Sequence, residues 1–207
     1  MKLRSRLLHL LAGWGSVGLV YFSSDLLQGQ GALLPETALD RAIPYNDAAI
    51  WLYLSFFILI PYAYLVADAV RVRWLARAMM ICALICGVVF LLYPTTLTYP
   101  PVGNGSGWST QALRWLQAMD STQNCLPSLH GALTLLCVWA LYDRLRLLRS
   151  TLAALLGVAI CYAIIALRRH LGIDLAAGLA VGLAGGMLAN LQLSLSERRA
   201  LSMKAAS

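Results

Sequence analysis

The chain has 207 residues, of which 60% are apolar and only 12% are charged. Soluble domains are nearer half apolar and a quarter charged, so this composition excludes an ordinary soluble domain and predicts one membrane domain over residues 1–207. The formal net charge is +7, but the basic residues stand in short groups between apolar runs, so no nucleic-acid partner is expected.

The N-terminal stretch, MKLRSRLLHLLAGWGSVGLVYF, combines a positive start with an apolar run, as a signal peptide does. Its apolar part is long and no clear small-residue cleavage site follows, so an uncleaved first membrane span is the better interpretation.

Further apolar runs approach the length of about 20 residues that a transmembrane helix needs. In chain order the runs cover residues 7–27, 48–66, 74–93, 129–142, 152–167 and 173–193, and the fourth and fifth are short. None shows the two-residue alternation of a membrane β-strand. The sequence therefore predicts an all-α integral membrane bundle of about six transmembrane helices.

Six spans place four basic segments on the same side of the membrane. These segments contain Lys2, Arg4 and Arg6; Arg71, Arg73 and Arg77; Arg144, Arg146 and Arg149; and Arg198, Arg199 and Lys204. The positive-inside rule makes this side cytoplasmic, with both termini inside. We expect a bacterial inner-membrane protein with its other face in the periplasm.

Residues 94–127 form a predicted outer loop, which opens with a segment rich in proline and glycine. Within it, residues 109–119 are expected to form a short amphipathic helix with Ser109 as its N-cap. One face would carry Leu113, Leu116 and Met119, and Trp108 and Trp115 suit the lipid headgroup level.

Three glycines, Gly178, Gly182 and Gly186, recur at four-residue spacing in the last span. In a membrane helix this spacing predicts close packing against a neighbouring helix.

The predicted topology brings three ionisable residues to one outer face: His130 at the start of the fourth helix, and His170 and Asp174 at the start of the sixth. His170 and Asp174 have i, i+4 spacing and would share a helix face. A carboxylate there can fix the tautomer of the ring and make its other nitrogen more nucleophilic. The alternative is an aspartate that caps the helix beside an interfacial histidine.

The segment NCLPSLH, residues 124–130, has the features of a capped helix start. Pro127 fits a first helical turn and Ser128 could cap it. Free N–H groups at a helix N-terminus suit a phosphate, and His130 in that turn could donate a proton to a leaving oxygen. The alternative is an ordinary capped helix with an exposed histidine.

NCLPSLH and, about forty residues later, RRHLGIDLAAG together resemble the signature of the type 2 phosphatidic acid phosphatase superfamily. The second motif of that superfamily reads like PSGH, and its third ends HxxxD. Leu129 in place of glycine resembles the branch that contains inositol phosphorylceramide synthases, as does the pattern of residues 43–68. The likeness covers residues 43–186, the predicted catalytic core.

The resemblance implies that His170 attacks phosphorus and forms a phosphohistidine, that Asp174 orients His170, and that His130 protonates the leaving group. It implies no metal and no cofactor. The five cysteines show no metal-ligand spacing either, and four of them lie in apolar runs.

The sequence departs from the family pattern where the phosphate-binding cations are expected. The first motif, KxxxxxxRP, is missing, and Ile164 stands where an arginine usually precedes the third-motif histidine. The candidates to supply the missing charge are Arg168 or Arg169, and in addition Arg114, unless these arginines only anchor headgroups. Ser128 and Asn124 complete the predicted substrate-binding residues.

These features predict a membrane lipid phosphatase acting on a lipid phosphate or pyrophosphate that enters sideways from the bilayer. One alternative is a lipid phosphotransferase of the inositol phosphorylceramide synthase type, which needs an alcohol acceptor. A second is an intramembrane serine protease that pairs Ser128 with His170. A third is a proton-relaying transporter, although the predicted helix centres lack ionisable residues. The oligomeric state is left open.

Overall fold

Long apolar helices dominate the computed structural model, which describes residues 1–103 and 105–205, with side chains through residue 193. Within these residues, five helical stretches are long and apolar enough to cross a membrane. They are α1 (Leu3–Leu27), the stretch Asp47–Val66, α5 (Ala69–Leu92), α8 (Leu147–Ala166) and the part Gly172–Leu193 of α9 (Gly172–Ala205). The predicted all-α membrane bundle is confirmed, while the side chains of Arg198, Arg199 and Lys204 lie outside the described residues.

The fourth predicted span, residues 129–142, is shorter than a membrane crossing requires. It forms α7 (Leu129–Leu141), whose 13 residues fall below the about 20 needed. The preceding chain is irregular yet buried, with Asn124 and Cys125 each only 1% exposed. Irregular backbone at membrane depth persists only where protein covers it, and α7 packs against α4 (Phe56–Val66), α5, α8 and α9. The start of α7 therefore lies inside the bundle.

The stretch Asp47–Val66 is not one continuous helix. It consists of η1 (Asp47–Ala49), α3 (Ile50–Leu54) and α4, interrupted at Ser55. The Ser55 hydroxyl donates to the Leu52 carbonyl at 2.5 Å, and Pro61 inside α4 has no N–H to donate. These two residues weaken the hydrogen bonding of the helix. The break at Ser55 allows the axis of α3 to differ in direction from the axis of α4.

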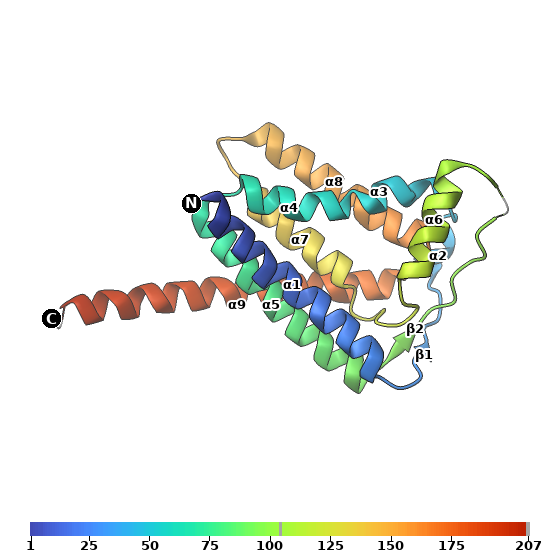
Figure 1. Ribbon diagram of the computed structural model, residues 1–207, viewed down its shortest axis with the longest axis horizontal. Helices are drawn as coiled ribbons and strands as arrows, with labels where there is room; N and C mark the ends of the chain where they lie inside the picture. Colours follow the sequence, from blue (N-terminus) through green and yellow to red (C-terminus); the bar gives the residue numbers. More distant parts are fainter. Residues whose placement is uncertain (104, 206–207) are drawn as a thin grey trace.

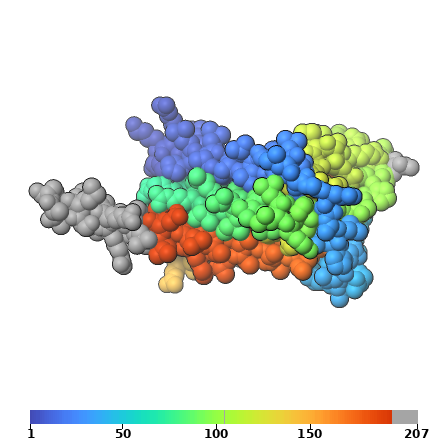
Figure 2. All heavy atoms as spheres, turned by 90° about the horizontal axis from the view of Figure 1, so that it is seen from below, coloured from blue at the N-terminus to red at the C-terminus, as the bar shows by residue number. Residues whose placement is uncertain are grey.

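Three helices, α1, α5 and α9, lie side by side across one face, with α5 in the middle (Figure 2). The N-terminus and the turns α4–α5 and α7–α8 gather at one end of the bundle (Figure 1). There Arg6 donates to the carbonyls of Tyr64 and Ala67, and Arg71 donates to that of Trp139. The described basic segments therefore share one end and bind helix C-termini. That this end is cytoplasmic stays a prediction.

The opposite end carries α2 (Ala38–Ala42), α6 (Trp108–Met119) and two paired parallel strands, β1 (Ala32–Leu33) and β2 (Thr95–Thr96) (Figure 1). The sequence predicted α6 but not the strands, which are only two residues long. Ser109 as the N-cap of α6 is wrong, because Gly107 holds that position. The Ser109 hydroxyl instead accepts from Trp51 Nε1 at 3.0 Å. Leu113 and Leu116 are buried, whereas Met119 is 66% exposed.

The glycine stripe of α9 packs against α7, as predicted. A Cβ at Gly178 would overlap the Ser128 carbonyl, one at Gly182 would lie 2.8 Å from the Ala132 oxygen, and one at Gly186 would lie 2.6 Å from the Trp139 ring. Two of these contacts are with backbone atoms, which cannot swing aside.

Gly178→Ala is therefore expected to destabilise the protein by about 1–3 kcal/mol, because α7 and α9 must move apart. Gly15→Ala is the matched control, since a Cβ there meets nothing within 4 Å. Thermal unfolding of both variants in one detergent tests this expectation. Equal midpoints for the two variants would show that the helices do not meet at Gly178.

Candidate active site

The chain between α8 and α9 makes a tight turn centred on Arg168. The Arg168 N–H donates to the Ile165 carbonyl, and the Arg169 N–H donates to the Ile164 carbonyl. This is the hydrogen-bond pattern of a Schellman motif, and Arg168, with φ of 55°, occupies the left-handed position that usually belongs to glycine. The turn ends α8 and directs Arg169 and His170 away from the helix axis.

His170 therefore lies outside both helices, and its predicted place on a shared helix with Asp174 is wrong. The helix α9 begins only at Gly172, because the Schellman turn takes up the preceding residues. The two side chains still meet: His170 Nδ1 lies 3.6 Å from Asp174 Oδ2.

Asp174 combines the two roles that the sequence left as alternatives. Its Oδ2 accepts the Leu171 N–H at 2.8 Å, which caps α9 in the manner of half a capping box. The same oxygen faces His170, and Asp174 is fully buried. The cap therefore fixes the carboxylate beside the imidazole.

The start of α7 is bonded directly to the start of α9. Ser128 caps α7 as predicted, accepting the Gly131 N–H at 3.2 Å, although Pro127 precedes the cap instead of lying in the first turn. The Ser128 N–H donates to the Asp174 carbonyl at 3.0 Å. This junction brings His130 Nδ1 to 3.3 Å from His170 Nε2 and confirms that the histidine motifs converge.

Tyr53 of α3 holds the far side of the His130 ring. Its hydroxyl lies 2.9 Å from His130 Nε2, and the ring of Phe56 packs on His130 with centroids 4.8 Å apart. No sequence motif predicts a role for Tyr53 in the site. The available signal was a tyrosine within an apolar run, since a buried hydroxyl needs a partner.

Arg169 lies beside the histidines with its charge incompletely paired. It is 3% exposed, its guanidinium stands 4.1 Å over the Tyr99 ring, and Nη1 lies 3.6 Å from Asp120 Oδ2. Among the described residues, no nitrogen of this guanidinium has a hydrogen-bond partner. Buried guanidinium groups normally make several hydrogen bonds, so Arg169 is equipped to receive an anion.

The other predicted binding residues use their polar groups within the protein. Arg168 donates to the Ile43 and Ile165 carbonyls and pairs with Glu36 at 3.4 Å. Arg114 donates to two carbonyls of its own loop, and the Asn124 amide bonds Tyr21 and Gln28 across to α1. Among the described residues, no group of three or more His, Cys, Asp or Glu could hold a metal ion.

An apolar groove leads to His130, and its volume of about 530 Å³ lies within the range of about 300–1,000 Å³ that is usual for ligand pockets. It runs between α1, α3, α4, α6 and the start of α7 and reaches His130 and Asp120. Its apolar lining includes Trp14, Val17, Phe22, Phe57, Trp115 and Leu133. The groove therefore connects apolar surface with the polar site.

Asp40 supports the site from α2. It accepts from the N–H and hydroxyl of Thr37 and, at 2.6 Å, from the N–H of Gly172 at the start of α9. Burial raises the pKa of Asp40, but these hydrogen bonds and the charge of Arg168 outweigh burial, so the pKa lies below its ordinary value.

A carboxylate with a lowered folded-state pKa contributes stability above its ordinary pKa, and this is lost as pH falls through the folded-state pKa. We therefore expect the unfolding temperature to fall below about pH 4, where an aspartate normally titrates. Asp40→Asn should destabilise the protein at pH 7 by about 1–2 kcal/mol and weaken this acid dependence. The control is Asp68→Asn, since Asp68 makes no side-chain cap bond. Parallel acid profiles for Asp40→Asn and wild type would contradict this assignment.

At one end of this helical membrane bundle two histidines face each other beside a buried carboxylate and a buried arginine. Such a site defines a class of membrane protein suited to anionic substrates. A family model described as PAP2 superfamily matches residues 32–188, and the chain belongs to that superfamily, whose type 2 phosphatidic acid phosphatase motifs it resembles. Members are generally phosphatases or phosphotransferases, which supports phosphatase-type chemistry on a lipid phosphoester. No curated protein matches the chain.

Proposed function

We propose that this protein is a membrane lipid phosphatase that cleaves a lipid phosphate or pyrophosphate through a phosphohistidine on His170. The observation that carries the proposal is the pair of histidine nitrogens 3.3 Å apart, with Asp174 behind one ring and Tyr53 behind the other. Arg169 supplies a buried positive charge beside them, and within the described residues its nitrogens make no hydrogen bond.

One set of histidine tautomers accounts for each contact along the series Tyr53, His130, His170 and Asp174. The Tyr53 hydroxyl donates to His130 Nε2, which leaves the His130 proton on Nδ1, facing His170 Nε2. The His170 proton then lies on Nδ1, facing the Asp174 carboxylate. His170 Nε2 therefore carries the lone pair needed for attack, and Asp174 stabilises the positive ring that forms.

In the first step, His170 Nε2 bonds to phosphorus while the bond from phosphorus to the leaving oxygen breaks. In the substrate complex His130 carries a second proton, on Nε2 toward the Tyr53 oxygen, and it gives its Nδ1 proton to the leaving oxygen, which leaves a neutral imidazole. In the second step, His130 accepts a proton from water, the water oxygen bonds to phosphorus, and the N–P bond breaks to release phosphate. Arg169 would offset charge on the phosphoryl oxygens throughout. A separation of 3.3 Å cannot hold phosphorus between the nitrogens, so substrate binding must part the histidines.

The apolar groove supports a lipid as the substrate. The acyl chain of a lipid could lie on the apolar lining between α1, α4 and α6 while the polar headgroup of the same lipid reaches His130 and Asp120. Because the bilayer is as apolar as the groove, packing contacts with the lining, and not removal from water, would hold the chain.

A phosphotransferase is the second candidate, favoured by Leu129 in the second motif and by the pattern of residues 43–68. An alcohol would then replace water in the second step. The protease alternative has less support, because both ring nitrogens of His170 face other groups and the Ser128 hydroxyl caps α7.

The test uses the purified protein in detergent with a chelator present. A panel of lipid phosphates and pyrophosphates is supplied, and free phosphate and new phospholipid products are assayed together, with and without added alcohols. Release of free phosphate by the wild type, but not by His170→Ala, supports the phosphatase. A new lipid that forms only with an added alcohol supports the transferase. No turnover in detergent or in native lipid would overturn both.

A further inference from the structure

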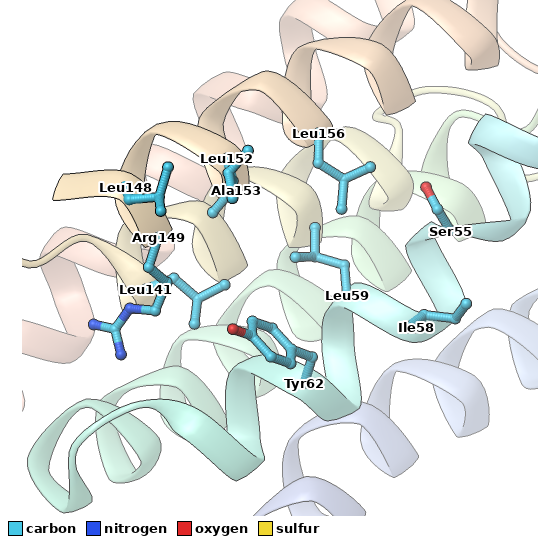
Figure 3. A pocket seen from close by; sticks show the side chains of 10 residues that line it. All are labelled: Ser55, Ile58, Leu59, Tyr62, Leu141, Leu148, Arg149, Leu152, Ala153 and Leu156. Atoms are coloured by element: carbon cyan, nitrogen blue, oxygen red, sulfur yellow. The ribbon is translucent and has the colours of Figure 1, made fainter. Parts of the chain in front are cut away.

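A second apolar groove, of about 410 Å³, lies between α4 and α8, with Leu141 of α7 at its floor (Figure 3). One wall is formed by Ser55, Ile58, Leu59 and Tyr62, and the other by Leu148, Leu152 and Leu156. Ala153 has too small a side chain to fill the space between the walls. This groove shares no lining residue with the groove that leads to His130.

Arg149 lines the groove close to Leu141 (Figure 3). Its side chain is only 15% exposed, and Nη2 forms an ion pair with Asp143 Oδ2 at a long 3.4 Å. Among the described residues, Nε and Nη1 of Arg149 have no hydrogen-bond partner. A buried guanidinium with two unsatisfied nitrogens calls for a further anion, because leaving its donors unpaired costs free energy.

The surroundings of Arg149 have a net positive charge. The turn between α7 and α8 and the first residues of α8 carry Arg144, Arg146 and Arg149 against the single acid Asp143. This turn lies at the end of the bundle opposite α6 and the histidines (Figure 1). The groove therefore has an apolar length within the bundle and a cationic end at the membrane surface.

We propose that this groove binds an anionic phospholipid from the leaflet opposite the histidines, with one acyl chain between α4 and α8 and the phosphate at Arg149. The lining residues on each helix extend over about eight positions, which at about 1.5 Å per residue gives roughly 12 Å of contact for the chain. Basic pockets between transmembrane helices are suited to anionic headgroups, and the phosphate completes the bonding of the guanidinium.

The α4 helix separates this lipid from the groove that leads to His130, which we call the catalytic groove. Phe56 and Phe57 line the catalytic groove, and Ile58, Leu59 and Tyr62 face the lipid. Because Phe56 packs on the His130 ring, the lipid lies against the helix that helps to position His130.

The experiment is native mass spectrometry of the full chain in detergent titrated with phosphatidylglycerol, with phosphatidylcholine of the same chains as the neutral comparison. Arg149→Gln, and Ala153→Phe, which fills the groove, should each weaken the retained adduct about five- to tenfold. Arg146→Gln is the matched control, since it removes an equal charge from a side chain that is 63% exposed. It should change binding less than twofold. Unfolding midpoints verify that each variant is folded.

Arg169→Gln separates this site from the catalytic one and should leave the adduct intact. Loss of the adduct in Arg169→Gln would assign the lipid to the catalytic groove and overturn the proposal. Equal losses in Arg146→Gln and Arg149→Gln, or equally tight binding of phosphatidylcholine, would also overturn it. Retention of the adduct in both Arg149→Gln and Ala153→Phe would do the same, whether or not the protein proves to be a phosphatase.

Discussion

His170→Ala is expected to lower phosphate release from the preferred lipid at least about 10³-fold, as loss of a covalent nucleophile does. Without its Nε2, water would have to attack the phosphoester directly. Arg169 and the apolar groove remain in this variant, so KM should change far less than kcat. Steady-state kinetics in one detergent with a chelator measure both constants.

The same variant tests whether the intermediate is covalent. Rapid acid quenching would destroy a phosphohistidine, so the reaction is stopped in alkali, where the N–P bond survives. Wild-type protein incubated with radiolabelled lipid phosphate should retain label, and His170→Ala should retain none. His9→Ala is the control, because His9 lies on α1 and its Nδ1 bonds the Ser5 carbonyl of the same helix. Label retained in His170→Ala would assign the nucleophile to another residue.

Asp174→Asn should keep the fold and lose most of the activity. An asparagine can still accept the Leu171 N–H through its oxygen, so the cap on α9 is conserved. It cannot offset positive charge on His170, and we expect a loss of about 10²–10⁴-fold in kcat. A rate within about threefold of wild type, with an unchanged unfolding midpoint, would limit Asp174 to its capping role.

The features that depend on local pattern could be predicted from the sequence. Hydrophobic runs locate the spans because a bilayer imposes both length and apolarity, and the spacing of Gly178, Gly182 and Gly186 predicts close packing. The convergence of His130 and His170 followed from the topology, since alternate helix ends return to the same face. The contacts in the structure agree with both expectations.

The details of the site depend on turns whose residues carry weak signals. An arginine at the left-handed position of the Schellman turn is no sequence signal that α8 ends there, so the sequence predicts a helical position for His170. The sequence also cannot separate Arg168 from its neighbour Arg169. The turn decides between them, because it directs Arg168 toward Glu36 and the Ile43 carbonyl, and Arg169 toward Tyr99 and Asp120.

Arg169→Gln is expected to lower kcat/KM about 10²–10³-fold, as removal of a group that stabilises transition-state charge does. Its guanidinium is buried beside the histidines. In the described part of the chain, the guanidinium nitrogens have no hydrogen-bond partner. Arg169→Lys should recover only part of the activity, because an ammonium has no planar fork and stacks less well over Tyr99.

Arg168→Gln is the matched control for Arg169→Gln, since it removes the same charge one residue away. Arg168 already donates to two carbonyls and pairs with Glu36. Its loss should therefore lower the unfolding midpoint and leave the turnover number nearly unchanged. Equal losses of kcat/KM in both variants would show that the rate depends on the total positive charge near the site and not on a contact made by Arg169.

The ion pair of Arg169 with Asp120 provides an independent test. Phosphate must compete with Asp120 for this guanidinium, so inorganic phosphate should inhibit Asp120→Asn at lower concentrations than wild type, and Arg169→Gln only at higher ones.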